Sequence, residues 1–221
     1  MITYGSAFSG IGGFDRVFDA VGMRCAWQIE KDADCQRVLR RHWPSVARYD
    51  DICEVGSGAV TAVDLLCGGF PCQDLSVAGK RAGLAGERSG LFHQFMRLAA
   101  ELTPRWLCIE NVPGLLSSNG GRDMGTVVAA LGKLGYGWAY RVLDAQFFGV
   151  AQRRRRVFIV GCLGSPARAA QVLFEPESLP GHSAPCRGAG QGLAGTLGGG
   201  TGSRGWSSDT DRMTFLPERA L

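Results

Sequence analysis

A cysteine stands at the end of a short apolar stretch, in a place where its thiol could act as a nucleophile. Residues 63–67 read as a buried strand, and Gly68-Gly69-Phe70-Pro71-Cys72 follows directly. The carboxyl ends of parallel strands face the crevice in which open α/β sheets bind ligands. A thiol attacks as its thiolate, so this role requires neighbouring cationic or dipolar groups. Cys72 is therefore a candidate nucleophile, and its alternative is a small buried residue, as most free cysteines are.

A carboxylate occupies the equivalent position after a second apolar stretch. Residues 106–109 read as a buried strand and lead into Glu110-Asn111-Val112-Pro113-Gly114. If both strands are parallel members of one sheet, Glu110 shares an edge with Cys72. A carboxyl group there could hold or donate a proton at a ring nitrogen of a substrate base. The alternative role for Glu110 is a structural cap on the Pro-Gly turn.

Basic residues gather in two places near these candidates. Gln152 precedes an unbroken run of arginines at 153–156, and a strand starting at Arg154 would place Arg154 and Arg156 on one face. The stretch 74–90 combines glycines with basic residues and lacks apolar periodicity, which indicates a mobile basic lid or a plain surface excursion. Such charge fits a nucleic-acid backbone as partner, and it fits a solvated surface equally well.

The amino-terminal segment has the layout of a nucleotide-binding unit. Residues 2–8 read as a strand, Ser9-Gly10-Ile11-Gly12-Gly13 as a turn, and the apolar spacing over 14–21 as a helix. Glycines in such a turn let the backbone and the start of the helix approach a ligand closely. The spacing is not Gly-x-Gly-x-x-Gly, which disfavours a dinucleotide oxidoreductase.

Acidic residues follow the next two predicted strands and are candidate cofactor ligands. The strand at 24–29 leads into Glu30, about 20 residues after the glycine turn, where acidic side chains accept hydrogen bonds from ribose. The alternative for Glu30 and Asp32 is a carboxylate favoured at the start of a helix. Asp51 follows a short extended piece and could accept a hydrogen bond from the exocyclic amine of an adenine; its alternative is a turn residue.

Composition limits the remaining possibilities. The chain has 221 residues, a formal net charge of +4 and eight cysteines with no Cys-x-x-Cys pair, so neither a metal site nor a disulfide framework is predicted. With no charged leader and no apolar run of membrane-spanning length, we expect a cytoplasmic protein without a membrane partner. Beyond residue 161, prolines and the glycine-rich run 188–205 are poor material for an independent core.

Four segments, taken in order, resemble the motifs of the DNA cytosine-5 methyltransferases. They are Phe8-Ser9-Gly10-Ile11-Gly12-Gly13-Phe14, Gly69-Phe70-Pro71-Cys72-Gln73, Glu110-Asn111-Val112 and Gln152-Arg153-Arg154-Arg155-Arg156. The resemblance covers about residues 1–163, which it implies to be a catalytic and cofactor-binding domain of α/β class. That fold is the class I, Rossmann-like methyltransferase fold, a mixed and mostly parallel sheet with helices on both faces. Residues 164–221 would be a partial, irregular target-recognition region.

The same resemblance implies S-adenosylmethionine as cofactor and S-adenosylhomocysteine as product. Phe8 would stack on the adenine, Gly10 and Gly12 would line the methionine portion, and Glu30 would bind the ribose hydroxyls. The other implied cofactor residues belong to the glycine turn and to the wall around the adenine, and they are Ile11, Gly13, Asp51, Ile52, Pro71 and Leu91.

The resemblance also implies a chemistry. The Cys72 thiolate would add to carbon 6 of a cytosine, which makes carbon 5 nucleophilic enough to take a methyl group. Glu110 would engage ring nitrogen 3 and the exocyclic amine, while two arginines hold the base carbonyl and neighbouring acidic groups. The target would be flipped out of double-stranded DNA, since carbon 6 is unreachable inside a duplex. The implied catalytic residues are Cys72, Glu110, Asn111, Gln152, Arg154 and Arg156.

The chain departs from the family pattern at its carboxyl end. Members of the family usually continue with an Arg-Pro-Leu element and a Gly-Asn-Ala/Ser-Val element that completes the cofactor pocket, and neither is visible before Leu221. The resemblance therefore implies either a truncated product or one half of a split enzyme. A split enzyme would have a carboxyl-terminal partner chain, and without such a partner we expect a monomer. Two further alternatives are a DNA- or cofactor-binding remnant without turnover and an RNA cytosine methyltransferase.

Overall fold

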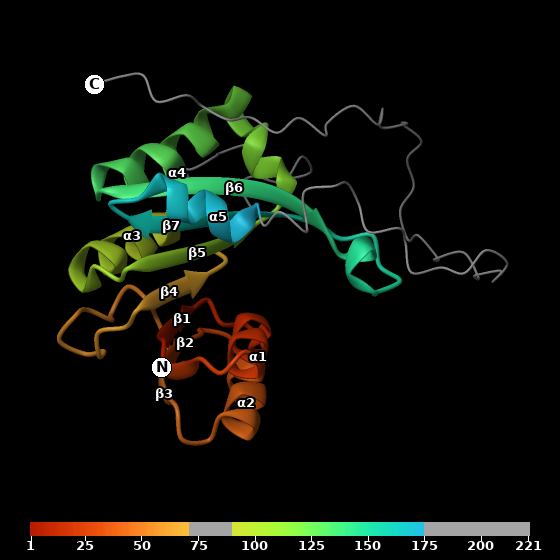
Figure 1. Cartoon of the computed structure of the whole chain (residues 1–221). Helices are drawn as coiled ribbons and strands as arrows, with labels where there is room; N and C mark the ends of the chain where they lie inside the picture. Colours follow the sequence, from red (N-terminus) through yellow and green to blue (C-terminus); the bar gives the residue numbers. More distant parts are fainter. Residues whose placement is uncertain (71–89, 175–221) are drawn as a thin grey trace, which may run out of the picture.

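The computed structural model describes residues 1–70 and 90–174, and this part of the chain forms one seven-stranded sheet with helices around it (Figure 1). The strand order is β3-β2-β1-β4-β5-β7-β6. β7 runs antiparallel to both β5 and β6, whereas the pairs from β3 to β5 are parallel. The strands are β1 (Thr3–Ala7), β2 (Arg24–Ile29), β3 (Ala47–Tyr49), β4 (Leu65–Gly68), β5 (Trp106–Asn111), β6 (Tyr136–Asp144) and β7 (Arg155–Leu163).

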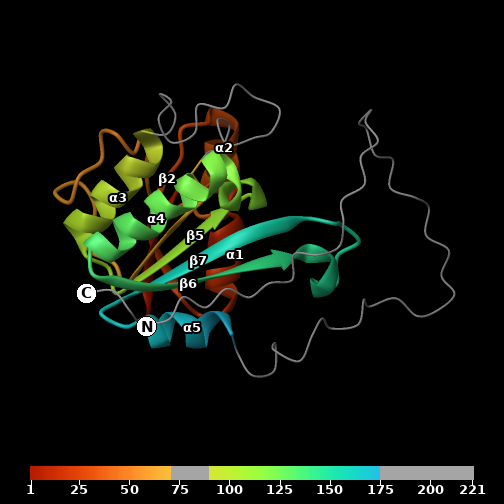
Figure 2. The ribbon, with the colours of Figure 1, turned by 90° about the horizontal axis from the view of Figure 1, so that it is seen from above.

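Helices cover both faces of this sheet. Figure 2 shows α3 and α4 on one face, with α1 and α5 on the other. The helices are α1 (Gly13–Ala20), α2 (Ala33–His42), α3 (Gly90–Leu102), α4 (Arg122–Lys133) and α5 (Pro166–Leu173), with short 3-10 helices η3 (Pro113–Leu116), η4 (Ser118–Gly121) and η5 (Ala145–Phe148). The α/β fold with a mixed, mostly parallel sheet is therefore confirmed.

The larger core lies between the sheet and the α3–α4 layer. Phe92 and Phe95 of α3 are fully buried against side chains from the central strands, such as Leu66 and Ile109. Burying each side chain of this size stabilises the fold by about 1.5–3 kcal/mol relative to leaving it exposed. Because alternate strand residues face opposite ways, Cys67 and Cys108 point instead toward the α1–α5 layer.

A buried polar cluster fixes α1 to the first two strands. The Asp15 side chain is fully buried and accepts hydrogen bonds from Ser6 Oγ at 3.0 Å and from Gln28 Nε2 at 2.9 Å, with Cys25 Sγ at 3.4 Å. Tyr4 donates its hydroxyl proton to Asp19 Oδ1 at 2.8 Å, and the same hydroxyl oxygen lies 3.2 Å from the main-chain oxygen of Asp15. Burial raises the pKa of the Asp15 carboxyl. The cluster holds the start of α1, and with it the glycine turn, at the carboxyl end of β1.

Several element boundaries differ from the sequence predictions. The predicted strand at 63–67 begins only at Leu65, and β5 continues beyond the predicted 106–109 through Glu110 to Asn111. Sheet pairing extends β5, since Glu110 and Asn111 pair with β7. After residue 163, the chain forms α5, which packs against β6 and β7. The predicted domain boundary between residues 163 and 164 stays a prediction. Among the helices of the described residues, none is long and apolar enough to cross a membrane.

Candidate active site

The glycine turn after β1 has a backbone that few residues other than glycine adopt. Gly10 and Gly12 have positive φ angles of 55° and 90°, and Phe8 shares this left-handed region at 54°. A bulky residue there is unusual and marks a strained segment of the kind that occurs at ligand sites. A Cβ on Gly12 would lie 2.5 Å from the Trp43 ring, whereas nothing lies within 4 Å of a Cβ on Gly10. The turn is thus closed on the Trp43 side and open at Gly10.

Glu30 connects this turn to the end of β2. One oxygen of its carboxylate accepts a hydrogen bond from Gly10 N at 2.7 Å and the other from Asp32 N at 2.8 Å. Asp32 in turn caps α2 by accepting from the backbone N–H groups of Asp34 and Cys35. The helix-start role considered for Asp32 is confirmed, and the ribose role of Glu30 stays a prediction.

The segment after β3 brings a second carboxylate to the same edge. Asp51 accepts hydrogen bonds from Lys31 Nζ at 2.7 Å and from Cys53 N at 2.9 Å. The Lys31 ammonium is the largest cause that lowers the pKa of Asp51, to about 2. Ile52 beside it is buried. The turn-residue role of Asp51 is confirmed, because its side chain caps the turn that follows.

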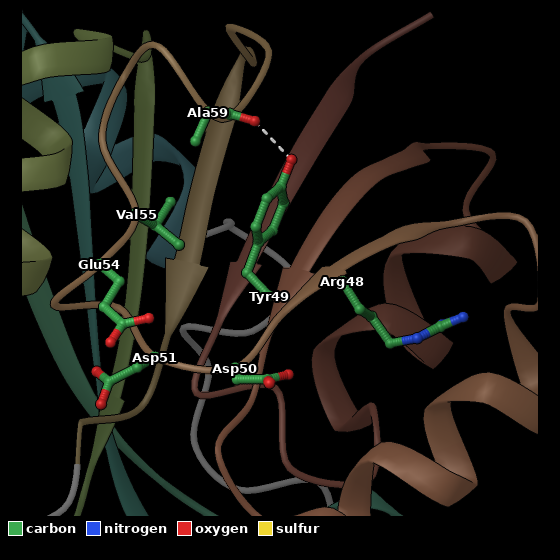
Figure 3. Close-up of a pocket in the computed structure, with 7 residues that line it drawn as sticks. All are labelled: Arg48, Tyr49, Asp50, Asp51, Glu54, Val55 and Ala59. Atoms are coloured by element: carbon green, nitrogen blue, oxygen red, sulfur yellow. Dashed lines mark hydrogen bonds between the residues drawn. The ribbon is translucent and has the colours of Figure 1, made fainter.

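A pocket of about 320 Å³ opens next to β3 (Figure 3). Among the described residues predicted to bind the cofactor, Asp51 alone lines this pocket, and Tyr49 closes one side by donating its hydroxyl proton to the main-chain oxygen of Ala59. The pocket therefore lies beside β3, the end strand of the sheet, and neither the glycine turn nor Glu30 lines it. Its lining residues are Arg48, Tyr49, Asp50, Asp51, Glu54, Val55 and Ala59.

An acid held by two arginines lies where β5 meets β7. Arg156 Nε lies 2.8 Å from Glu110 Oε1, and Arg154 Nη2 lies 3.9 Å from the same oxygen. The pairing explains the geometry, because Glu110 is in register with Phe158 of the antiparallel β7 and every second residue shares its face. The side chains of Glu110 and Arg156 are about three-quarters buried (26% and 24% exposed), whereas that of Arg154 is 50% exposed. The predicted common face of Arg154 and Arg156 is confirmed.

The residues that follow β4 fit closely against Glu110. A Cβ on Gly69 would lie only 2.8 Å from Glu110 Oε2, so glycine is needed for this approach. Asn111 is buried, donates to Phe70 O at 3.5 Å and accepts from Val112 N at 2.8 Å. These contacts bind the end of β4 to the end of β5, immediately before the position of Cys72 in the sequence.

Other predicted residues are less closely associated with this edge. Leu91, the second residue of α3, lies half-buried against the main core, and Gln152 is exposed between η5 and β7. Pro71, Cys72 and the basic stretch 74–89 lie outside the described residues.

Phe14 of α1 makes an edge-on contact with Phe158, with ring centroids 6.4 Å apart. The glycine turn and the Glu110–arginine cluster are therefore neighbours along one sheet edge.

Sequence reasoning missed the buried partners that support the turn. Asp15 and Gln28 were not singled out, although each is a polar residue inside an otherwise apolar pattern. A polar residue at a core position is a usable signal, because it is stable there only with a hydrogen-bond partner. Gln36 was missed as well, and it donates to Glu30 O at 2.6 Å and to Asp50 Oδ1 at 2.8 Å.

The fold and this edge define the chain as a methyltransferase-like α/β protein, and comparisons with known proteins agree. The structure of the S. pombe Dnmt2 methyltransferase superposes with a TM-score of 0.61 at 19% identity, over 75% of this chain and 52% of that one. The Bacillus subtilis (strain 168) type II methyltransferase M2.BsuMI is 41% identical over 184 residues, covering 81% of this chain and 45% of the relative. A protein of Escherichia phage P1 named DNA N-6-adenine-methyltransferase is 33% identical, covering 84% of this chain and 32% of that protein.

The family model described as C-5 cytosine-specific DNA methylase matches residues 2–179. The chain belongs to this family. It spans less than half the length of the two relatives described above.

Proposed function

We propose that this chain carries the catalytic half of an enzyme that transfers a methyl group from S-adenosylmethionine to carbon 5 of cytosine in DNA. Residues 1–163 would bind the cofactor and perform the chemistry, and residues 164–221 would form part of a target-recognition region. Membership of the C-5 cytosine-specific family supports this target atom over the adenine named for the phage P1 relative.

The residues at the carboxyl edge fit the proposed cofactor. Nothing lies within 4 Å of a Cβ position at Gly10, so the turn offers open space beside a strained backbone. Phe8, Gly10 and Gly12 would hold the adenosyl and methionine portions, and Glu30 is held close to the turn by its hydrogen bond to Gly10 N. Asp51 and Ile52 would bracket the adenine, with Pro71 and Leu91 completing the wall. The bound cofactor supplies an electrophilic methyl group on a positively charged sulfur.

The chain's own residues prepare the cytosine for that methyl group. The Cys72 thiolate adds to carbon 6, and the displaced electron pair increases the charge at carbon 5 and ring nitrogen 3. Glu110 holds a proton at nitrogen 3, which stabilises this charge. Carbon 5 then takes the methyl group, its hydrogen leaves to a base or to water, and the electron pair of that bond expels Cys72 from carbon 6. Cysteine and carboxyl group are both restored.

Arginines and the basic stretch 74–90 would complete the proposed site. Arg156 orients Glu110 through their 2.8 Å contact, and the more exposed Arg154, 3.9 Å from the same carboxylate oxygen, would reach the base carbonyl or a phosphate. Flipping the target cytosine costs roughly a few kcal/mol. The basic stretch 74–90 and Gln152 would offset part of this cost by contacting the DNA and the emptied position in the duplex.

The observation that carries the proposal is the close approach of Gly69 to Glu110. Gly69 leaves only 2.8 Å between a Cβ position and the Glu110 carboxylate, and Asn111 binds the backbone of the neighbouring Phe70. Cys72 follows Gly69 by three residues in the sequence. Three extended residues span at most about 11 Å, so this connection supports a cysteine and a carboxyl group acting on one base.

Methyl transfer to DNA that contains 5-fluorocytosine tests the mechanism. Fluorine at carbon 5 cannot leave as a proton does, so the cysteine adduct should persist and run as a protein–DNA band on a denaturing gel. We expect the band with the native chain, its loss in Cys72→Ala, and its retention in Cys35→Ala, a matched change in α2. Methylation of ordinary DNA by Cys72→Ala would contradict the proposal.

Measurements of ligand binding and of methyl transfer together separate the alternatives. A native chain that binds S-adenosylhomocysteine and DNA but transfers no methyl group would be a remnant, or a split enzyme if a carboxyl-terminal partner chain restores transfer. Preferential labelling of RNA over DNA of the same sequence would identify an RNA cytosine methyltransferase.

A further inference from the structure

An arginine of α3 holds the irregular segment that follows β3. Arg97 Nη2 donates hydrogen bonds to Ile52 O and to Val55 O, both at 2.8 Å. The rest of the guanidinium is also engaged, because Nε donates to Gln94 Oε1 and Nη1 to Glu101 Oε1, each at 2.7 Å. One side chain thus joins a helix to two carbonyl groups of a segment that has no regular secondary structure.

Glu101 extends this connection along the segment. Its Oε1 forms the ion pair with Arg97, and its Oε2 accepts a hydrogen bond from Ser57 N at 2.8 Å. The neighbouring Gly56 leaves 3.4 Å between a Cβ position and that oxygen. The Arg97 guanidinium is the largest cause that lowers the pKa of the Glu101 carboxyl. Arg97 and Glu101 therefore fix residues 52–57 at three backbone positions.

The held segment begins at the residues assigned to the adenine. Asp51 accepts a hydrogen bond from Cys53 N, and the Ile52 carbonyl that Arg97 binds belongs to the peptide group containing that N–H. A rotation of this peptide would both break the hydrogen bond from Arg97 to Ile52 O and turn the N–H away from Asp51. Two contacts orient the Asp51 carboxylate, one from Lys31 Nζ and one from Cys53 N. The second consequently depends on Arg97, although Arg97 lies on a different element, 45 residues away from Ile52.

We propose that Arg97 is a positioning residue that sets the selectivity of the chain for the adenine of its cofactor. It acts through the Ile52 peptide and Asp51, and it does not contact the cofactor. This inference rests on the proposed function, which assigns Asp51 and Ile52 to the adenine. The planar guanidinium has N–H donors on three nitrogens, and here they reach two carbonyls, an amide oxygen and a carboxylate. An ammonium group has a single nitrogen and cannot reach all four acceptors.

Calorimetric titration with two ligands tests this role. S-adenosylhomocysteine carries the exocyclic amine that Asp51 would accept from, and S-inosylhomocysteine carries a carbonyl oxygen in its place. In Arg97→Gln we expect binding of the adenosyl compound to weaken about tenfold, the loss typical of one hydrogen bond to a charged group. Binding of the inosyl compound should stay within about twofold, so the preference between the two ligands shrinks.

Control variants separate positioning from general damage. Arg37→Gln makes the same chemical change at a 72% exposed arginine that pairs with Asp34 within α2, and it should leave the preference unchanged. Equal weakening of both ligands in Arg97→Gln would mean a merely structural role and would overturn the inference, as would an unchanged preference.

Two further outcomes have defined meanings. If Arg97→Gln does not melt cooperatively, Arg97→Lys replaces it in the titration. We expect Arg97→Lys to bind the adenosyl compound about threefold more weakly and the inosyl compound as the native chain does. Native affinity for both compounds would overturn the role of Arg97. If the native chain binds neither ligand, the cofactor assignment itself fails and the inference fails with it, whereas failure confined to the variants leaves the proposed function standing.

Discussion

Replacing Gly69 by alanine should damage the site while leaving the fold intact. The added Cβ would lie 2.8 Å from Glu110 Oε2 and 3.3 Å from Glu110 O, so the carboxylate must retreat until the contact reaches an ordinary 3.4 Å or more. The retreat strains the 2.8 Å contact between Glu110 and Arg156. A misplacement of about 1 Å can cost about 100-fold in rate, so we expect the rate constant of methyl transfer to fall roughly 10- to 100-fold.

The assay compares single-turnover methyl transfer with thermal unfolding of the same samples. A carboxylate that is 26% exposed can move toward solvent, so the melting temperature of Gly69→Ala should fall by less than about 4 °C, equivalent to about 1 kcal/mol. Gly132→Ala in α4 is the matched control, since nothing lies within 4 Å of its Cβ position. A native single-turnover rate in Gly69→Ala would refute the argument that this approach sets the position of Glu110.

Two stability predictions follow from the α1–β1–β2 region. Gly5→Ala would place a Cβ 2.1 Å from the buried Trp27 ring. Such overpacking should lower the melting temperature by about 5–10 °C in a thermal scan. An unchanged melting temperature would contradict this description of the packing. Burial raises the pKa of Asp15, so the folded state binds this proton more tightly than the unfolded state and the contribution of Asp15 to stability falls as pH rises above its unfolded value. The loss of unfolding free energy caused by Asp15→Asn, measured by urea unfolding, should therefore be smaller at about pH 8 than at about pH 4. A loss that does not change with pH would contradict this. Asp64→Asn is the control with the opposite trend, because backbone and side-chain hydrogen bonds from Thr3 lower the pKa of Asp64.

Local patterns in the sequence were sufficient for much of the fold. The strand, glycine turn and helix at the amino terminus could be predicted because their periodicities of two and 3.6 residues are local properties. The common face of Arg154 and Arg156 followed from strand alternation alone. Their ion pairs with Glu110 confirm that geometry.

Long-range contacts explain what the sequence did not reveal. The extension of β5 to Asn111 depends on pairing with β7, which is 46 residues further on. The Asp15 cluster and the Arg97 contacts likewise join residues that become neighbours only when helices pack on the sheet. Nothing in the residue types next to Arg97 indicates that its partners are two carbonyl groups about 40 residues earlier in the chain.

Because β7 runs in the reverse direction, its first residues lie at the border of the sheet where the parallel strands end, and its register decides which side chains meet there. Its nine residues span about 30 Å, so a strand running the other way would deliver its first arginine to the far side of the molecule. Sliding the β6–β7 hairpin by two residues would carry Arg156 about 7 Å along the strand and out of reach of its acid.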